Sequence, residues 1–234
     1  MTASSDNDEP IRGYASPPCY AAEIAPDYFG LPPDDPQQAC DVARWRRAER
    51  ERLRAMRFQI PADLRRDMVR AISGHLDVLI ARRLSDVAGH VVSVYWPIKA
   101  EFDLRFWMGV LHDRGAHIAL PVVETLKAPL VFRAWKPGSA MERGHWNIPV
   151  PATSSPLLTP EVTIAPVVGW DGEGYRLGYG GGYFDRTLAA LSPRPFVIGI
   201  GSEAARISTI FPQPHDIPMD AIVTEAGMQW EAGG

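Results

Sequence analysis

The residues best suited to chemistry in this sequence lie in the stretch RLGYGGGYFDR, which runs from Arg176 to Arg186. Three consecutive glycines weaken any helix or strand that contains them, which indicates that a backbone without side chains is required at this point. A glycine-rich turn that opens a helix presents backbone N–H groups and a helix dipole to an anion, usually a phosphate. Arg176 adds positive charge, and Asp185 can hold a metal ion that accompanies the phosphates. Taken alone, the stretch predicts either a phosphate-binding loop or a simple tight turn.

Other known glycine motifs fit this stretch poorly. A Walker-type loop ends in Gly-Lys-Ser/Thr, and the stretch has no such ending. The dinucleotide fingerprint Gly-x-Gly-x-x-Gly can be placed on Gly178 and Gly180, but its third glycine then falls on Tyr183. The stretch also lies too late in the chain for a first βα turn. We therefore expect neither of these two nucleotide motifs.

The elements around the loop predict an α/β fold. Short β-branched or apolar runs bounded by turns indicate strands, and these are HVVSVYWP, AHIALP, LVFRAW, VTIAPVV, FVIGIG and AIVTE. Helical patterns lie over residues 39–57, from about 62 to 80, near 103–114, and directly after the glycines, whereas 137–160 is expected to loop. Strands that alternate with helices imply a largely parallel sheet with helices on both faces. We expect one α/β domain over 41–234 with an N-terminal helical arm.

The first 40 residues differ from the rest of the chain. They hold seven prolines and no apolar periodicity, which predicts an irregular, acidic extension over residues 1–40. They also hold seven acids and one base, a balance of −6, so the net charge of −4 leaves about +2 for residues 41–234. A net charge of about +2 is too small for the broad basic surface that nucleic-acid binding requires, and we expect no nucleic-acid partner.

Composition is typical of a soluble globular protein. Of the 234 residues, 46% are hydrophobic and 22% are charged, and no apolar run is long enough to span a bilayer. Two cysteines are too few for a disulfide framework, and the N-terminus MTASSDNDEP lacks the basic and apolar parts of a secretory signal. We therefore expect a cytoplasmic monomer without a membrane partner.

Positive charge is concentrated in the first helical segment. Ten arginines stand between residues 44 and 70 against four acids, whereas the whole chain has three lysines. Arginine forms bidentate contacts with phosphates and carboxylates, so the segment could contribute to an anion site. The alternative is a solvated helix face.

Four segments together resemble the 5-formyltetrahydrofolate cyclo-ligase family, also called 5,10-methenyltetrahydrofolate synthetases. Besides the glycine stretch, they are VYWPIKAEFD (94–103), WNIPVP (146–151) and HDIPMDAIVTE (215–225). They stand in the family's order within about residues 41–225. The resemblance implies a three-layer α/β/α sandwich. It also implies the ATP-dependent closure of 5-formyltetrahydrofolate to 5,10-methenyltetrahydrofolate, with release of ADP and phosphate.

The resemblance further implies a role for individual residues. Those expected to bind ATP are Arg46, Arg176, Leu177, Gly178, Tyr179, Gly180, Gly181, Gly182, Tyr183 and Phe184. Those expected to bind the reduced folate are Trp96, Glu101 and Trp146, together with Tyr179, Gly180, Gly181, Gly182 and Tyr183. Asp185 and Asp216 are expected to hold Mg²⁺, and Arg176 and Asp185 to be catalytic.

Simpler interpretations remain for several of these residues. Trp96 and Trp146 could be core aromatics, and Glu101 could be an exposed carboxylate at the start of a helix. Asp216 and Asp220 could merely shape the turn before the last strand.

The chain also departs from the family pattern at two positions. The family has a basic pair four residues apart in its first helix, and the first member of that pair falls on Val42, so Arg44, Arg47 or Arg50 would have to substitute. Ala205 stands where the family often has glutamine. These departures leave two alternatives open: a folate- or nucleotide-binding protein without turnover, and a related enzyme acting on another N-formyl substrate.

Overall fold

The computed structural model describes residues 36–233, so the expected extension lies outside the described residues up to position 35. Helix α1 spans Pro36–Gln59 and begins before the boundary at residue 40 that the sequence suggested. Proline is compatible with the first turn of a helix, because the N–H group that it lacks would have no intrahelical acceptor there. The segment 36–40 is therefore helical, and the prediction that it is irregular was wrong.

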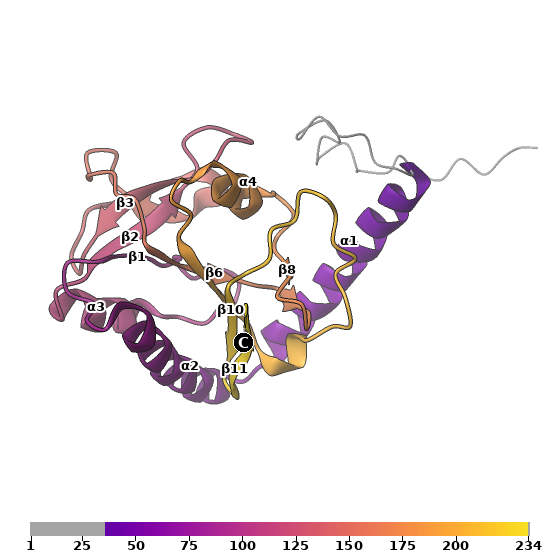
Figure 1. Cartoon of the computed structure of the whole chain (residues 1–234), viewed down its shortest axis with the longest axis horizontal. Helices are drawn as coiled ribbons and strands as arrows, with labels where there is room; N and C mark the ends of the chain where they lie inside the picture. The colour runs from indigo at the N-terminus through magenta and orange to yellow at the C-terminus, as the bar shows by residue number, and fades with distance from the viewer. Residues whose placement is uncertain (1–35, 234) are drawn as a thin grey trace, which may run out of the picture.

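A seven-stranded sheet in the order β11-β10-β9-β6-β1-β2-β3 forms the centre of the molecule (Figure 1). In chain order the strands are β1 Val91–Ser93, β2 His117–Val122, β3 Val131–Trp135, β6 Val162–Pro166, β9 Phe196–Ile200, β10 Ala221–Thr224 and β11 Gly227–Glu231. The five inner strands are parallel, and both edge strands, β3 and β11, pair antiparallel. The expected largely parallel sheet is confirmed. β11 is an additional strand that the sequence analysis did not predict.

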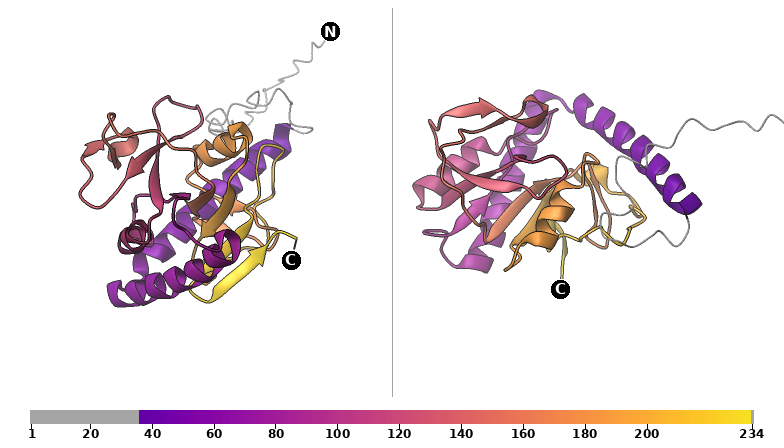
Figure 2. Two further views of the ribbon diagram at one scale, coloured as in Figure 1. Left: turned by 60° about the vertical axis from the view of Figure 1, so that its left-hand side comes forward. Right: turned by 90° about the horizontal axis from the view of Figure 1, so that it is seen from above.

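Two hydrophobic cores on opposite faces of this sheet make the fold a three-layer α/β/α sandwich. Helices α2, Ala62–Leu84, and α3, Arg105–Asp113, pack on one face. Helix α1 and helix α4, Tyr183–Ala190, contribute to the core on the other face. Residues of β6 alternate between the two cores, with Ile164 on the first side and Ala165 on the second. Figure 2 shows the layers from two further directions.

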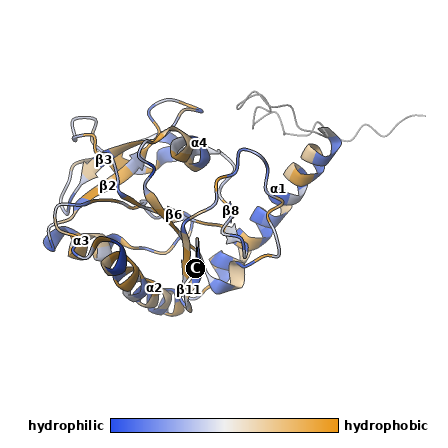
Figure 3. Ribbon diagram, viewed as in Figure 1, coloured by the Kyte–Doolittle hydropathy of each residue, from blue (hydrophilic) through white to orange (hydrophobic). Residues whose placement is uncertain are grey.

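The charged surface of α1 sets it apart from the buried strands. Hydropathy colouring shows mostly hydrophobic residues on the central strands and a mixture with many hydrophilic ones along α1 (Figure 3). The residues of α1 in the second core include Leu53, which is 2% exposed, and Met56. None of the helices within residues 36–233 is long and apolar enough to cross a membrane.

Two small hairpins interrupt the regions expected to loop. β4, Met141–Arg143, pairs with β5, Pro149–Pro151, and a 3-10 turn at His145–Asn147 joins them. β7, Gly169–Trp170, pairs with β8, Arg176–Leu177, immediately before the glycines. Pairs of two or three residues carry too little periodicity to be recognised in a sequence.

The direction of strand addition reverses between β1 and β6. From β1 the chain adds β2 and β3 on one side, then returns to place β6, β9 and β10 on the other. In open α/β sheets, ligands bind beyond the carboxyl ends of the strands at such a switch point. The VYWPIKAEFD segment follows β1 and the GWDGEGYRLGYGGG segment follows β6, so both resemblance motifs reach this edge.

Candidate active site

The glycine loop connects β8 to α4 with two glycines in left-handed conformations. Gly180 has φ of 96° and Gly182, at the cap position of α4, has φ of 62°. Residues with a Cβ adopt these values only with strain, which accounts for two of the three glycines. Asp185 lies in the first turn of the helix that follows. The expected arrangement of a glycine turn opening a helix is present.

Arg46 and Asp216 form an ion pair at one end of the site. The Arg46 Nη2 atom lies 2.5 Å from Asp216 Oδ2, and both side chains are nearly buried, at 6% and 10% exposure. Arg46 also donates to the carbonyls of Ile210 and Phe211 at 2.9 and 2.8 Å. The Gln213 N–H donates to Asp216 as well. Five hydrogen bonds therefore fix the guanidinium and the carboxylate that face it.

Arg176 and Asp185 form a second, parallel ion pair. Arg176 Nη2 lies 2.9 Å from Asp185 Oδ1, and Arg176 Nη1 donates to the Ile217 carbonyl at 2.9 Å. The Ile217 N–H donates to the same carboxylate oxygen of Asp185 at 3.2 Å. Because Ile217 follows Asp216 directly, the two predicted metal ligands lie in one neighbourhood. The fold therefore brings together two carboxylates that are 31 positions apart in the sequence.

Asp220 lies elsewhere and serves the fold. It accepts hydrogen bonds from Arg194 and from the Val197 N–H, and it bonds Val197 again through its own backbone. Val197 is near the start of β9, at the amino end of the parallel strands. Asp220 is therefore no substitute for Asp216 as a metal ligand, and the turn-shaping role applies to Asp220.

Arg50 is the arginine that lies one helical turn beyond Arg46 and faces the glycine loop. Its Nε donates to the Gly178 carbonyl at 2.8 Å, and its guanidinium lies about 3.5 Å from where a Cβ on Gly180 would be. Burial and the nearby charge of Arg46 lower the pKa of Arg50 to about 10. By contrast, Arg44 is largely exposed and pairs with Asp41 on the helix surface.

Glu101 is buried at the end of a strained turn after β1. It is 6% exposed, its Oε2 accepts from the Ile98 N–H at 2.8 Å, and its Oε1 has no hydrogen-bond partner among the described residues. Lys99 and Ala100, within the turn, have positive φ of 48° and 63°, a costly conformation that is typical of functional sites. Burial raises the pKa of the Glu101 carboxyl. The alternative of an exposed helix-opening carboxylate is wrong.

Tyr179 of the glycine loop lies beside Glu101. Burial first, and then the Glu101 charge, raise the pKa of the Tyr179 phenol to about 12, so it is a neutral hydroxyl at physiological pH. Arg57 donates a short hydrogen bond to this hydroxyl. Glu101 and Tyr179, which the resemblance assigns to folate binding, therefore lie side by side.

Trp146 lies over the glycine loop with one face open. It is 55% exposed and stacks near His145 and Tyr183, with ring centroids 4.7 and 6.1 Å away. A Cβ on Gly181 would lie 2.9 Å from the Tyr183 ring and 3.4 Å from the Trp146 ring. Trp146 also has a positive φ of 55°, a conformation that the surrounding structure must impose. Trp146 is therefore an exposed aromatic beside the glycine loop, and the core alternative is wrong for it.

The other aromatic and apolar candidates lie farther into the fold. Trp96 packs against the first core, with Trp135 at 6.5 Å and the Arg105 guanidinium at 5.1 Å, rather than against the glycine loop. Leu177 is 1% exposed in the second core, so only its backbone can meet a ligand. The Phe184 ring packs on the same core, 5.7 Å from the Arg176 guanidinium.

Two residues that the sequence analysis did not assign to the site support it. Arg186, 5% exposed, donates to the Gly181 carbonyl at 2.6 Å and so braces the glycine loop. Asp171, 1% exposed, accepts from the backbone N–H groups of Tyr175 and Ile210, and thereby fixes the carbonyl that Arg46 uses. The arginine that closes RLGYGGGYFDR was a visible signal. Asp171 had none, because the partner that ties it to the site, the Ile210 N–H, lies 39 residues away in the sequence.

The two aspartates suit a magnesium ion that arrives with phosphates. Mg²⁺ usually takes one or two carboxylates together with water and phosphate oxygens. No group of three or more His, Cys, Asp or Glu side chains within residues 36–233 is arranged for a metal ion. Within residues 36–233, both hydrogen bonds to the Asp185 carboxylate use Oδ1, so Oδ2 remains for a ligand.

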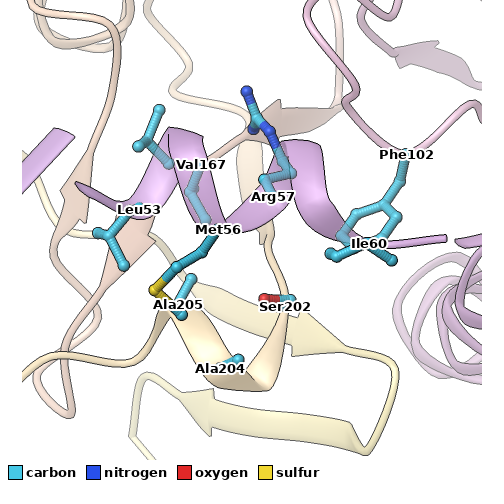
Figure 4. A pocket seen from close by; sticks show the side chains of 10 residues that line it. Leu53, Met56, Arg57, Ile60, Phe102, Val167, Ser202, Ala204 and Ala205 are labelled. Carbon is cyan, nitrogen blue, oxygen red and sulfur yellow. The ribbon is translucent and has the colours of Figure 1, made fainter. Parts of the chain in front are cut away.

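A small apolar cavity of about 70 Å³ lies beneath α1 at the departure position Ala205 (Figure 4). Leu53, Met56 and Ala205 line it, and the Arg57 guanidinium points away from these side chains. A short apolar residue at 205 accounts for part of this space. A second, more open hollow of about 320 Å³ lies by the β4–β5 hairpin.

The fold is similar to that of two solved 5,10-methenyltetrahydrofolate synthetases. The NMR structure of the 5,10-methenyltetrahydrofolate synthetase of Aquifex aeolicus superposes with a TM-score of 0.69 and 25% identity, covering 81% of this chain and 94% of that one. A 5,10-methenyltetrahydrofolate synthetase of Mycoplasma pneumoniae, 20% identical, shows the same fold with a TM-score of 0.60 over 77% of this chain and 98% of that one.

The chain belongs to the 5-formyltetrahydrofolate cyclo-ligase family, whose model matches residues 42–225. A 5-formyltetrahydrofolate cyclo-ligase of Mycolicibacterium smegmatis is 28% identical over 72% of this chain and 87% of its own length. The enzyme of that name from Escherichia coli strain K12 is 30% identical over 62% of this chain and 82% of its own length. The family resemblance seen in the sequence is confirmed.

Proposed function

We propose that this protein catalyses the ATP-dependent cyclisation of 5-formyltetrahydrofolate to 5,10-methenyltetrahydrofolate, with release of ADP and phosphate. The observation that supports it most strongly is the joint placement of two dissimilar sites at one sheet edge. Arginines and the glycine loop suit a polyphosphate, and the buried Glu101 beside Tyr179 suits a neutral donor-rich ring. A reaction between a nucleotide and a pterin requires both.

The nucleotide end consists of the glycine loop, Arg46, Arg50 and Arg176. Arg50 replaces the first basic residue of the family's helical pair, whose position falls on Val42; it lies about two helical turns farther along α1 and is bonded to the loop itself. Charge-assisted bonds from guanidinium groups and loop N–H groups then neutralise and align the triphosphate. The departure at Val42 therefore gives no support to a protein without turnover.

The folate end centres on the unpartnered Oε1 of Glu101. A buried acceptor without a partner is costly, and a ligand that donates a hydrogen bond to it removes that cost. The amino-pyrimidine edge of a pterin carries such donors. Trp146, open on one face above the glycine loop, is positioned to stack on the flat part of the folate.

The chemistry needs no nucleophile from the protein. The formyl oxygen attacks the γ-phosphorus of ATP, the bond from that phosphorus to the ADP oxygen breaks, and ADP leaves. N10 then attacks the activated formyl carbon and loses its proton, the carbon–oxygen bond breaks, and phosphate leaves. The residues of the site align the two substrates and stabilise the charge on the phosphoryl group.

We further propose that Mg²⁺ accompanies ATP and is held by Asp185 and Asp216. When bound, the ion would neutralise phosphate charge and order the phosphate oxygens. Arg46 and Arg176 would then either keep their bonds to these carboxylates alongside the ion or turn toward the phosphates. We also propose a monomeric cytoplasmic enzyme, which sedimentation of the full chain and fractionation of its host would check.

The proposal is tested by incubating the full chain with magnesium, ATP and 5-formyltetrahydrofolate. The near-ultraviolet absorbance of the methenyl product should rise, with one ADP formed per product and no rise without ATP. Binding of both ligands without product would favour the protein without turnover, for which the Ala205 departure is the remaining argument. Absence of folate binding would favour another N-formyl substrate.

A further inference from the structure

Three cations surround the ring of Tyr179, the loop residue beside Glu101. The guanidinium carbons of Arg54 and Arg57 lie 5.6 and 5.8 Å from the ring centroid, and Lys99 Nζ lies 5.4 Å away. Arg57 also donates to the Tyr179 hydroxyl. These residues come from two elements far apart in the chain, α1 and the turn after β1, so the cluster is a product of the fold.

The cluster holds more positive than negative charge. No carboxylate within residues 36–233 forms a salt bridge with Arg54, Arg57 or Lys99. Glu101 is the acid whose charge interacts with Arg57 and Lys99. Three cations face one carboxylate; Arg54 and Arg57 are partly buried, whereas Lys99 is exposed. The partly buried excess of positive charge is unfavourable until an anion arrives.

Part of this charge is also short of hydrogen bonds. The Nε atoms of Arg54 and Arg57 are buried and have no partner among the described residues. Other arginines of α1 differ: Arg52, for example, donates through Nε to Glu49 at 2.9 Å. Arg46 and Arg50 likewise use their Nε atoms within the protein, so the buried Nε donors of α1 left unused within the described residues are those of Arg54 and Arg57, near Tyr179.

The order of residues along α1 places the cluster between the two substrates. Arg50, Arg54 and Arg57 are spaced by four and three residues, so they share one face of the helix. Arg50 contacts the loop at the proposed nucleotide end, and Arg57 reaches Tyr179 at the proposed folate end. A group that passes from ATP to the formyl oxygen must cross the space between them.

We propose that Arg57, assisted by Arg54 and Lys99, binds the phosphoryl group during its transfer from ATP to the formyl oxygen. This inference rests on the proposed function and adds catalytic residues to it. A transferring phosphoryl group is an anion whose charge spreads over its outer oxygens, and arginines that meet those oxygens stabilise the transition state more than either substrate. The bonds that form and break are those given above, and the cluster itself takes and gives no proton.

The glutamate carboxylates of the folate are the competing anion. They lie at the far end of the molecule, beyond the aminobenzoyl ring, whereas the cluster surrounds the residue next to Glu101. A pterin edge on Glu101 therefore brings N5 and its formyl group near the cluster and carries the glutamate away from it. Chemistry at the formyl group is favoured for this reason.

The test compares Arg57→Ala, Arg57→Lys and Arg54→Ala with Arg52→Ala, a control at an exposed arginine of the same helix. We expect Arg57→Ala to lower kcat about 100- to 1000-fold, as for other preorganised transition-state donors. The dissociation constants of ATP and of 5-formyltetrahydrofolate should stay near the wild-type values. Arg57→Lys should recover part of the rate, and the control should match wild type.

A binding measurement separates stabilisation of the transition state from a structural role. ADP with aluminium fluoride mimics a phosphoryl group in transfer, and calorimetry with folate present should show weaker binding of this mimic to Arg57→Ala than to wild type, while ADP alone binds equally. Thermal unfolding of each variant verifies that it is folded.

The possible results differ clearly. A raised folate dissociation constant with unchanged kcat would overturn the proposal in favour of a glutamate site. Wild-type kinetics in Arg57→Ala would overturn it while leaving the proposed function intact. If the wild-type protein forms no methenyl product, the proposed function fails and this inference fails with it.

Discussion

Arginines at the two ends of the site differ in how their charge is balanced. At the nucleotide end, Arg46 and Arg176 are nearly buried, and each is paired with an aspartate. Toward the folate end, Arg54 and Arg57 have no carboxylate partner within the described part of the chain. An arginine paired with an aspartate is held in place before the substrate arrives, but the aspartate already neutralises part of its charge. An unpaired arginine keeps its full charge for an anion and costs stability until that anion binds.

The paired end also shows how the two aspartates are kept in one neighbourhood. Two carboxylates placed to share one metal ion would repel each other in the free protein if nothing else neutralised them. The structure shows instead that a guanidinium neutralises each of them. If Mg²⁺ binds these carboxylates as proposed, it must compete with the two arginines, and a triphosphate that attracts the same arginines would help to release them.

The largest effect should come from Arg176→Ala. We expect kcat to fall about 100- to 1000-fold, because a charge facing the phosphates is lost. The sequence alone suggested little loss of stability. The ion pair changes this, because Asp185 remains mostly buried and unpaired, and breaking such a pair costs about 3–5 kcal/mol. Kinetics and urea unfolding measure the two losses. In Arg176→Ala with Asp185→Asn, stability should partly return but activity should not.

The next effect concerns the metal ion. Asp185→Asn and Asp216→Asn should each raise the magnesium concentration for half-maximal activity severalfold, because each removes a charge that the cation uses. The double variant should lose little more than the worse single variant, since both residues serve one ion. Asp220→Asn is the matched control. It should lower the melting temperature through Arg194 and leave the magnesium dependence unchanged. A magnesium dependence unaltered in Asp216→Asn would remove Asp216 from the site.

A smaller effect is expected for Arg50→Ala. The Michaelis constant for ATP should rise about tenfold, which corresponds to one charge-assisted contact of about 1.4 kcal/mol. Stability should change little, because Arg50 has no carboxylate partner within residues 36–233 and its burial disfavours the charge. Arg44→Ala, on the exposed face of the same helix, is the control. Equal ATP kinetics in both variants would show that Val42 has no replacement.

The smallest effect is on stability in Glu101→Gln. Burial raises the folded-state pKa above the ordinary value of 4.5, so the folded protein binds this proton more tightly than the unfolded chain. The ionised carboxylate therefore costs stability increasingly as pH rises from 4.5 through the folded pKa. The variant should melt slightly higher than wild type at neutral pH and equally below pH 4.5. Its folate binding should weaken while ATP binding persists. A lower melting temperature at neutral pH would contradict this account.

Much of the fold could be predicted because its signals are local. Strand segments such as VTIAPVV and FVIGIG are β-branched and bounded by turns, and five of them pair in parallel as expected. The edge strand β11 was missed because half-exposed residues such as Gln229 and Trp230 give no clear pattern. The start of α1 was also missed, since the prolines before residue 40 favoured irregular structure.

The local structure of the site was predictable where all the residues that determine it lie in one segment. The glycine stretch supplies its own left-handed residues and its own helix start, so RLGYGGGYFDR determined the turn that opens α4. Trp96 illustrates the opposite case. Its place in the motif suggested substrate contact, whereas packing turns it toward Trp135 and Arg105.

The sequence by itself determined the family, the alternation of strands and helices, and the bare backbone before α4. Only the tertiary structure decided which charges face the ligands. Arg44, Arg46, Arg47 and Arg50 are equivalent as letters, and helical spacing only separates them into faces. The inward face is chosen by contacts that span the chain, such as those of Arg46 with Asp216, 170 residues away, and of Arg50 with Gly178, 128 residues away. Such pairings depend on how α1 packs against the rest of the fold. The contacts of the whole helix together decide which of its faces is buried, and therefore which arginines point inward.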